Sequence, residues 1–181
     1  MNLWQRILTM LMLATTLAVT PAAAAADDPL SAIDALDATL NAQNVDGALA
    51  LFADDATVRQ SPPQPGSTGV YQGKAAVRAF LVSDVAQNIH FDLASPRQVV
   101  GERVTWINNT AIDPWRNLGI APLQGQGDAT VHGGKIVSLT ITLTPDSLAK
   151  LQRAVAASLP SGPPRAGGGS EVSFIRRLGD G

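Results

Sequence analysis

The clearest pattern in the chain is a pair of alternating apolar and polar runs, Gly125–His132 and Lys135–Thr144, joined by Gly133-Gly134. Alternation with a period of two is typical of strands, and two glycines between such runs are typical of a tight hairpin turn, because both turn residues need positive φ. One face of the second run carries Val137, Leu139, Ile141 and Leu143, whereas the other carries Ile136, Ser138, Thr140 and Thr142. The hairpin therefore predicts a sheet with one apolar face that other elements must cover.

Amphipathic helices are predicted before and after this hairpin. Asp28-Pro29 has the pattern of an N-cap followed by proline at the first helical position, and apolar residues then recur every three or four positions. The same spacing returns later in the chain, so the predicted helices are Pro29–Gln43, Lys74–Gln87 and Pro145–Ser158, with a short one before Asp54-Asp55. On the helix Lys74–Gln87 the expected apolar face consists of Val77, Phe80, Leu81 and Val85.

Further strands are predicted from β-branched and aromatic residues in alternation. They are Ala56–Gln60, Ile89–Leu93, Gln98–Val100 and Arg103–Ile112. Ser61–Gly69 is rich in proline and glycine and is expected to be a loop, as is Asp113–Ala121. Helix, short helix, strand, helix and then an antiparallel meander predict an α+β fold with an additional C-terminal helix.

The first 26 residues have the three parts of a secretory signal peptide. The basic Arg6 is followed by the apolar run Ile7–Val19 and by alanines at positions 22–26, where cleavage is expected. A membrane anchor is the alternative, but this run is shorter than the roughly 20 residues that span a bilayer. We therefore expect a secreted or periplasmic domain at residues 27–160 with no membrane anchor after cleavage, followed by a disordered Gly/Pro-rich tail at residues 161–181.

Composition excludes several kinds of chemistry. The chain has no cysteine, which excludes disulfides, thiol catalysis and thiolate metal sites. Its 13 basic and 15 acidic residues give a net charge of −2, and no basic stripe alternates with aromatic residues, so nucleic acid is not an expected partner. His90 and His132 have no metal-binding spacing with Asp92 or Asp128, so we expect no metal and no cofactor.

Four segments resemble the nuclear transport factor 2-like superfamily, and specifically its SnoaL-like branch. They are Leu40–Val58, Tyr71–Leu81, Val100–Trp106 and Gly133–Leu143. The resemblance implies a cone-shaped α+β fold, in which a curved antiparallel sheet wraps around the N-terminal helices and leaves a pocket between them. It also implies a possible homodimer that forms through the outer face of the sheet.

The resemblance extends to enzymes, but their catalytic residues are incomplete in this chain. Epoxide hydrolases of the superfamily resemble Gly101–Thr105, where Arg103 matches their arginine but Thr105 stands at the position of their aspartate. The strand Lys135–Thr144 contains no carboxylate that could act as the general acid, and a hydroxyl cannot replace a carboxylate base near neutral pH. We therefore expect no complete catalytic constellation.

Arg103 and Thr105 are the first candidates for ligand binding. They share one face of a predicted strand, opposite Val104 and Trp106, and the resemblance implies that the arginine face points into the pocket. The guanidinium of Arg103 could hold an anionic group, or it could form a salt bridge with Asp92 or Asp128. Trp106 is assigned to sheet packing or to a dimer face.

The segment Asp113-Pro114-Trp115-Arg116 supplies two further candidates, because it is expected at the rim of the pocket. Asp113 and Trp115 could contact a ligand, although anchoring of the loop to the sheet is the favoured role of Trp115. Tyr71 is a fifth candidate, which either points its phenol into the pocket or packs against the third helix.

Three functions remain open. The first is an exported domain that binds a small hydrophobic or anionic molecule in the cone pocket. The second is a lyase, isomerase or cyclase that acts on a hydrophobic carbonyl compound, with Asp55 or Asp113 as base. The third is an interaction module that dimerises through its sheet. A pocket carboxylate whose pKa is raised by burial would favour the enzyme.

Overall fold

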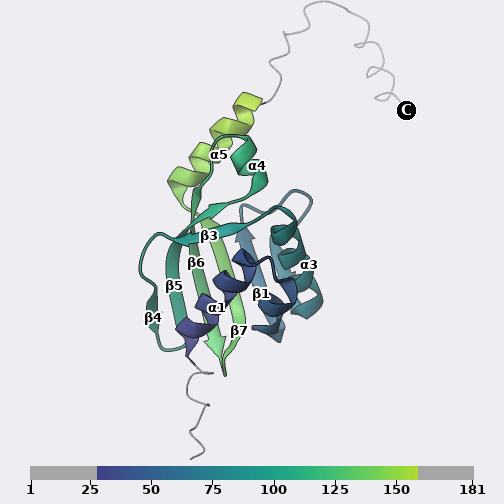
Figure 1. Ribbon diagram of the computed structural model, residues 1–181, viewed down its shortest axis with the longest axis vertical. Helices are drawn as coiled ribbons and strands as arrows, with labels where there is room; N and C mark the ends of the chain where they lie inside the picture. The colour runs from purple at the N-terminus through teal and green to yellow at the C-terminus, as the bar shows by residue number, and fades with distance from the viewer. Residues whose placement is uncertain (1–27, 159–181) are drawn as a thin grey trace, which may run out of the picture.

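A computed structural model describes residues 28–158 (Figure 1), and the predicted signal peptide and C-terminal tail lie outside the described residues. The helices are α1 (Pro29–Asn41), α2 (Val45–Ala50), α3 (Gly73–Ala86), α4 (Asp113–Asn117) and α5 (Pro145–Ser158). The strands are β1 (Phe52–Ser61), β2 (Val70–Gln72), β3 (His90–Leu93), β4 (Gln98–Val100), β5 (Arg103–Ala111), β6 (Leu123–His132) and β7 (Lys135–Leu143). Within this part of the chain, every helix is too short or too polar to cross a membrane.

A single curved sheet supports the molecule, with strand order β2-β1-β7-β6-β5-β3 and with β4 also paired to β5. Helices α1 and α3 lie against one face of this sheet (Figure 1), and their apolar residues join those of the sheet in one core. The predicted α+β fold with a curved sheet around N-terminal helices is therefore confirmed. The sheet is mixed rather than purely antiparallel, because β1 runs parallel to β7.

Helix α1 begins where the sequence predicts. The Asp28 carboxylate accepts hydrogen bonds from the backbone N–H groups of Leu30 and Ser31, both at 3.2 Å, and Pro29 occupies the first helical position. The buried face of the helix carries Ala32, Ile33, Leu36 and Leu40. Local capping thus fixes the start of the helix, and its apolar spacing fixes which side packs on the sheet.

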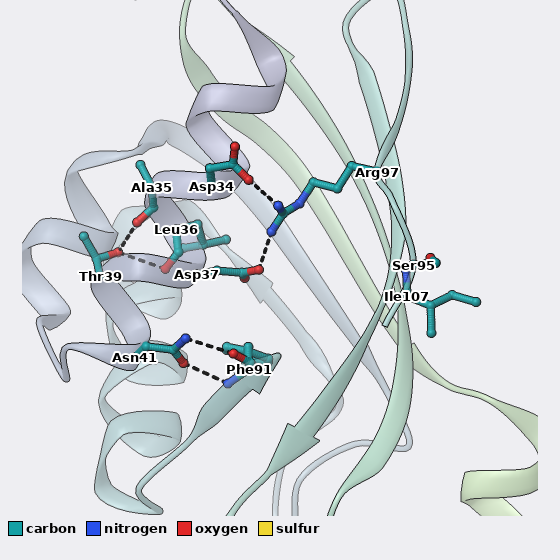
Figure 2. A network of polar contacts seen from close by, with 10 residues as sticks. All are labelled: Asp34, Ala35, Leu36, Asp37, Thr39, Asn41, Phe91, Ser95, Arg97 and Ile107. Atoms are coloured by element: carbon teal, nitrogen blue, oxygen red, sulfur yellow. Dashed lines mark hydrogen bonds and ion pairs between the residues drawn. The ribbon is translucent and has the colours of Figure 1, made fainter. Parts of the chain in front are cut away.

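The C-terminal end of α1 holds the edge strand β3. The Asn41 amide donates to the carbonyl oxygen of Phe91 at 2.9 Å and accepts from its backbone N–H at 2.8 Å (Figure 2). The Gln43 amide also donates to the carbonyl oxygen of Ile89 at 2.9 Å. These side chains satisfy backbone groups that an edge strand would otherwise leave open.

One bulge changes the apolar face of β7. Strict alternation predicts Ile136 on the polar face, but Ile136 is fully buried in the core. Ile136 pairs with Val131 whereas Ser138 pairs with Thr130, so β7 contains one extra residue at this point. The expected position of Ile136 is therefore wrong, and the bulge is the reason.

Two short elements were not expected from the sequence. The expected loop Asp113–Ala121 begins with the short helix α4, and Val70–Gln72, directly after the expected loop Ser61–Gly69, forms the small strand β2 against β1. Strand β1 begins at Phe52, four residues before the expected Ala56, because Asp54 and Asp55 are exposed strand residues and do not end a helix.

Trp106 packs directly on the backbone of Gly127, which is its partner across β5 and β6. A Cβ atom placed on Gly127 would lie 2.2 Å from Trp106 Cε2 and 2.3 Å from Cζ2. Real carbon atoms do not approach this closely, so only glycine fits beneath the indole ring. The position of the ring thus depends on the residue opposite it.

We expect Gly127→Ala to lower the free energy of unfolding by about 2–3 kcal/mol, because the added methyl group displaces the buried indole. Gly125→Ala is the matched control on the same strand face, since its Cβ would meet Asn108 Oδ1 at an ordinary 3.7 Å. The control should change stability by less than about 1 kcal/mol. Urea unfolding followed by circular dichroism measures both, and equal losses would contradict this account of Gly127.

Candidate functional site

A cavity of about 410 Å³ lies between the inner face of the sheet and the helices α3, α4 and α5. This main cavity is the size of many small-molecule sites. Its lining is largely apolar and includes Pro62, Pro63, Pro65, Ile89, Phe91, Ile112, Pro114, Trp115, Leu118, Ile141, Leu143, Leu151 and Val155. The polar lining residues are Gln60, Ser61, Gln64, Asp84, Gln87 and Thr110.

A second, smaller space of about 20 Å³ adjoins the main cavity on the side of α1. This inner chamber shares Asp84, Phe91 and Ile141 with the main cavity. Its other lining residues are Leu36, Asp37, Leu40, Phe80, Leu81, Trp106, Asn108, Gly127 and Leu139. A single water molecule needs about 10–15 Å³ by such a measure, so the inner chamber has room for one oxygen-sized group.

Asp84 is the only ionisable residue among the described residues that line the main cavity. It lies near the C-terminal end of α3 and is only 5% exposed. Its Oδ1 atom accepts a hydrogen bond from Gln64 Nε2 at 2.8 Å, and the hydroxyl of Ser83 donates to Gln64 Oε1 at 2.8 Å, which fixes the orientation of the amide. The second carboxyl oxygen receives no hydrogen bond from the described residues.

Burial raises the pKa of Asp84 to about 7, although the hydrogen bond from Gln64 acts in the opposite direction. The carboxyl group therefore exists in both protonation states near neutral pH. It can accept a proton from a bound molecule or return one, which an exposed aspartate does poorly. Asp84 is accordingly the best candidate for acid–base chemistry in the cavity.

A second carboxyl group, that of the partly buried Asp37, also lines the inner chamber. Arg97 extends from the loop between β3 and β4 and forms ion pairs with Asp34 and Asp37 of α1 (Figure 2). The side chain of Arg97 is 9% exposed, and its guanidinium lies 5.9 Å from the centre of the Trp106 ring. Burial raises the pKa of Asp37 to about 6, with the charge of Arg97 acting against it. This ion pair joins α1 to the sheet behind the chamber.

Residues 33–139 match the family model described as a SnoaL-like domain, and this match spans more than half of the chain. The chain belongs to the SnoaL-like domain family. Among the curated proteins, none matches the sequence of this SnoaL-like protein.

Several solved structures share the fold of this SnoaL-like domain. An NTF2-like protein of unknown function from Cytophaga hutchinsonii has 14% identity and a TM-score of 0.53, with 67% of this chain and 95% of that one covered. A candidate polyketide cyclase from Sinorhizobium meliloti has 17% identity and a TM-score of 0.51, over 63% and 98%. A candidate ketosteroid isomerase from Kribbella flavida has 16% identity and a TM-score of 0.51, over 67% and 79%. At these identities the likeness establishes the fold.

The structure places Arg103 and Thr105 on the outer face of the SnoaL-like sheet. On β5 the buried positions are Val104, Trp106, Asn108 and Thr110, so the expectation that the arginine face lines the pocket is wrong. Arg103 is exposed and pairs with Asp128 on β6, with 2.9 Å between Nε and Oδ1. A salt bridge with Asp128 was the alternative to ligand binding that the sequence left open for Arg103. Trp106 lies in the core beside the inner chamber.

The other three candidates have separate positions. Trp115 lines the main cavity and also packs in a small apolar cluster with α5. Tyr71 packs against the Phe80 ring on α3, with 4.9 Å between the ring centroids, and its hydroxyl donates to Ser67 Oγ. It is therefore absent from the lining of the main cavity.

Asp113 accepts hydrogen bonds from Asn88 and Arg116 on the surface, and these bonds lower its pKa. A carboxylate with a lowered pKa is a poor base.

Asp55, His90 and His132 are also absent from the lining of the main cavity. Asp55, the other proposed base, is exposed on β1. Histidine His90 lies 3.4 Å from Asp92, and His132 pairs with Glu102 at 2.6 Å near the hairpin turn. Within residues 28–158, no group of three His, Cys, Asp or Glu residues is placed to hold a metal ion.

Three buried polar residues line the main cavity or the inner chamber, namely Asp84, Asn108 and Thr110, and none of them was among the candidates. Asp84 follows Val77, Phe80 and Leu81 on the same side of α3, so helical spacing alone could have identified it as an acid on an apolar face. Asn108 and Thr110 follow Val104 and Trp106 by strand parity. The apolar side of β5 was the signal that could have placed them inside.

Proposed function

We propose that this SnoaL-like protein binds a small, uncharged and predominantly apolar molecule in the main cavity. The observation that carries the proposal is the cavity of about 410 Å³ with its largely apolar lining. Burial of an apolar molecule there removes its surface from water, which is the main source of affinity in such sites.

The charge of the lining favours an uncharged molecule over an anionic one. Among the described lining residues there is no lysine, arginine or histidine, and the one ionisable side chain is the carboxyl of Asp84. An anion would lose its hydration without gaining a counter-charge, which is costly in a buried site. Of the two ligand types expected from the sequence, the cavity thus supports the hydrophobic one.

A matched pair of fluorescent probes tests this proposal. N-phenyl-1-naphthylamine is uncharged, and 8-anilinonaphthalene-1-sulfonate has the same ring system with an added sulfonate. We expect the uncharged probe to bind and the sulfonate to bind at least roughly tenfold more weakly, which fluorescence titration measures. Absence of binding by both probes, or tighter binding of the sulfonate, would contradict the proposal.

The variant Leu151→Trp locates the binding site, because Leu151 of α5 lines the main cavity and a larger side chain there occupies part of the space. We expect it to weaken binding of the uncharged probe by roughly tenfold. Lys150→Trp introduces the same residue at the adjacent exposed position and should leave binding unchanged.

A second candidate function is proton transfer on a carbonyl compound, as in an isomerase or cyclase. Asp84 favours it, because a half-protonated carboxyl in an apolar cavity suits abstraction of a proton next to a carbonyl. Two proteins of the same fold are a candidate polyketide cyclase and a candidate ketosteroid isomerase. The names of these two proteins support proton transfer as a class of reaction, and they do not indicate a substrate.

Hydrogen–deuterium exchange of 2-tetralone tests this second function. The carboxylate of Asp84 would take a proton from the carbon next to the carbonyl and return a deuteron from solvent, with no net reaction. We expect exchange, followed by NMR, to accelerate as pH rises through about 7, since the base must be ionised. Asp84→Asn should reduce the catalysed rate by at least roughly 100-fold. Equal rates for the wild type and the variant would exclude Asp84 as the base.

A further inference from the structure

Most of the buried polar residues in the described part of the chain lie at one place in an otherwise apolar interior. Of the four that are buried in the described chain, Asp84, Asn108 and Thr110 all line the main cavity or the inner chamber. Asn108 and Thr110 are neighbours on the inner face of β5, and Asp84 approaches from α3. Polar groups that converge in an apolar cavity commonly fix the orientation of a bound molecule.

The side chain of Asn108 has no polar partner among the described residues. It is 6% exposed, and neither atom of its side-chain amide hydrogen bonds to another residue in the range 28–158. The amide is nevertheless not sealed in apolar packing, because Asn108 lines the inner chamber. A buried amide without a partner is destabilising, so its presence calls for a group that completes its hydrogen bonds.

The inner chamber limits what that group can be. Its volume of about 20 Å³ admits one oxygen-sized group, and it adjoins the main cavity at Asp84, Phe91 and Ile141. Two carboxyl groups, Asp37 and Asp84, also line it, and the charge of Asp37 is balanced by Arg97. The ionised carboxylate of Asp84 repels a carboxylate or a phosphate, whereas a neutral oxygen meets no such repulsion.

We infer that the inner chamber is an oxygen subsite, in which the amide of Asn108 hydrogen bonds to a single carbonyl or hydroxyl oxygen of a molecule whose apolar body fills the main cavity. This inference rests on the proposed binding function and names the class of ligand. Thr110, the next inward residue of β5, offers its hydroxyl to the same molecule from the wall of the main cavity.

The subsite makes the protein select against hydrocarbons and acids alike. A pure hydrocarbon leaves the Asn108 amide without a partner, and a carboxylic acid brings a negative charge beside the carboxyl group of Asp84. A site that contains a buried polar group rejects molecules that cannot pair with it. Ketones and alcohols with a compact apolar skeleton satisfy both conditions.

Three probes of one skeleton test the inference, namely 2-tetralone, 2-tetralol and tetralin. Isothermal titration calorimetry of residues 27–181, the chain without its predicted signal peptide, should give affinities for the ketone and the alcohol about five- to tenfold higher than for tetralin. Asn108→Leu should abolish this difference while tetralin binds as well as before. If Asn108→Leu fails to fold, Asn108→Ala removes the same amide and should have the same effect on selectivity.

Asn109→Leu is the matched control, since Asn109 lies on the outer face of the same strand. It should leave the preference for oxygen-bearing probes intact. Equal affinities of the wild type for all three probes would overturn the oxygen subsite while leaving cavity binding in place. An equal loss for all three probes in Asn108→Leu would also overturn it. Failure of all three to bind would overturn the proposed function itself, and the subsite with it.

Discussion

Arg97→Leu is expected to lower the free energy of unfolding by about 3–5 kcal/mol at pH 8, because it leaves the Asp37 carboxylate mostly buried and without its cation. The loss should shrink toward pH 5, where Asp37 takes up a proton and no longer carries an unpaired charge. Its pKa is about 6 even with Arg97 present, and removal of the guanidinium raises it further. Urea unfolding at pH 5 and pH 8 measures the two values.

Arg103→Leu is the matched control, since it breaks an ion pair of the same type on the exposed outer face of the sheet. Exposed pairs contribute little, so we expect a change below about 1 kcal/mol at both pH values. The double variant Arg97→Leu with Asp37→Leu should recover much of the loss, because the carboxylate that had lost its cation is then absent. A loss of equal size for Arg97→Leu and Arg103→Leu would show that burial does not distinguish the two pairs.

The second large effect is the pH dependence that Asp84 gives to stability. Its pKa is about 7 in the folded chain, whereas the ordinary pKa of an aspartate is 3.8, so the folded state holds this proton more tightly than the unfolded chain. Stability from this group is fully present below about pH 4 and is lost as pH rises through 7. The difference corresponds to roughly 4 kcal/mol between pH 4 and pH 8.

Asp84→Asn should remove this slope, since an amide does not titrate and can still accept the hydrogen bond from Gln64. We therefore expect the variant to gain stability relative to the wild type as pH rises, measured by urea unfolding between pH 4 and pH 8. Asp37 also lowers the free energy of unfolding as pH rises toward about 6, and this smaller slope remains in the Asp84→Asn variant. Asp92→Asn, at an exposed position on β3, is the control that should retain the full slope. Identical slopes for Asp84→Asn and the wild type would contradict the account of Asp84.

The sequence predicted those parts of the fold that depend on local rules. The cap at Asp28-Pro29 and the apolar spacing placed α1, and the Gly133-Gly134 turn placed the hairpin of β6 and β7. The extra residue in β7 and the parallel pairing of β1 with β7 were not predictable in this way, because both depend on strands far apart in the chain.

The candidate site was harder to predict, since strand alternation shows which residues share a face and not which face turns inward. Arg103 was assigned to the interior on the family resemblance, whereas burial of Val104 and Trp106 turns Asn108 and Thr110 toward the cavity. Asp84 could have been recognised from helical spacing, but its pKa depends on walls contributed by other elements. Local patterns thus located the elements, and the chemistry emerged only from their assembly.

The parallel pairing of β1 with β7 has a consequence for how the chain is made. Synthesis proceeds from the N-terminus, so β1 leaves the ribosome long before β7, the strand that covers one of its edges. Until then β1 has only the three-residue strand β2 beside it, and its backbone remains open to other chains. Nascent chains that stop before residue 135 are therefore expected to aggregate or to recruit chaperones, and completion of the last strand releases them.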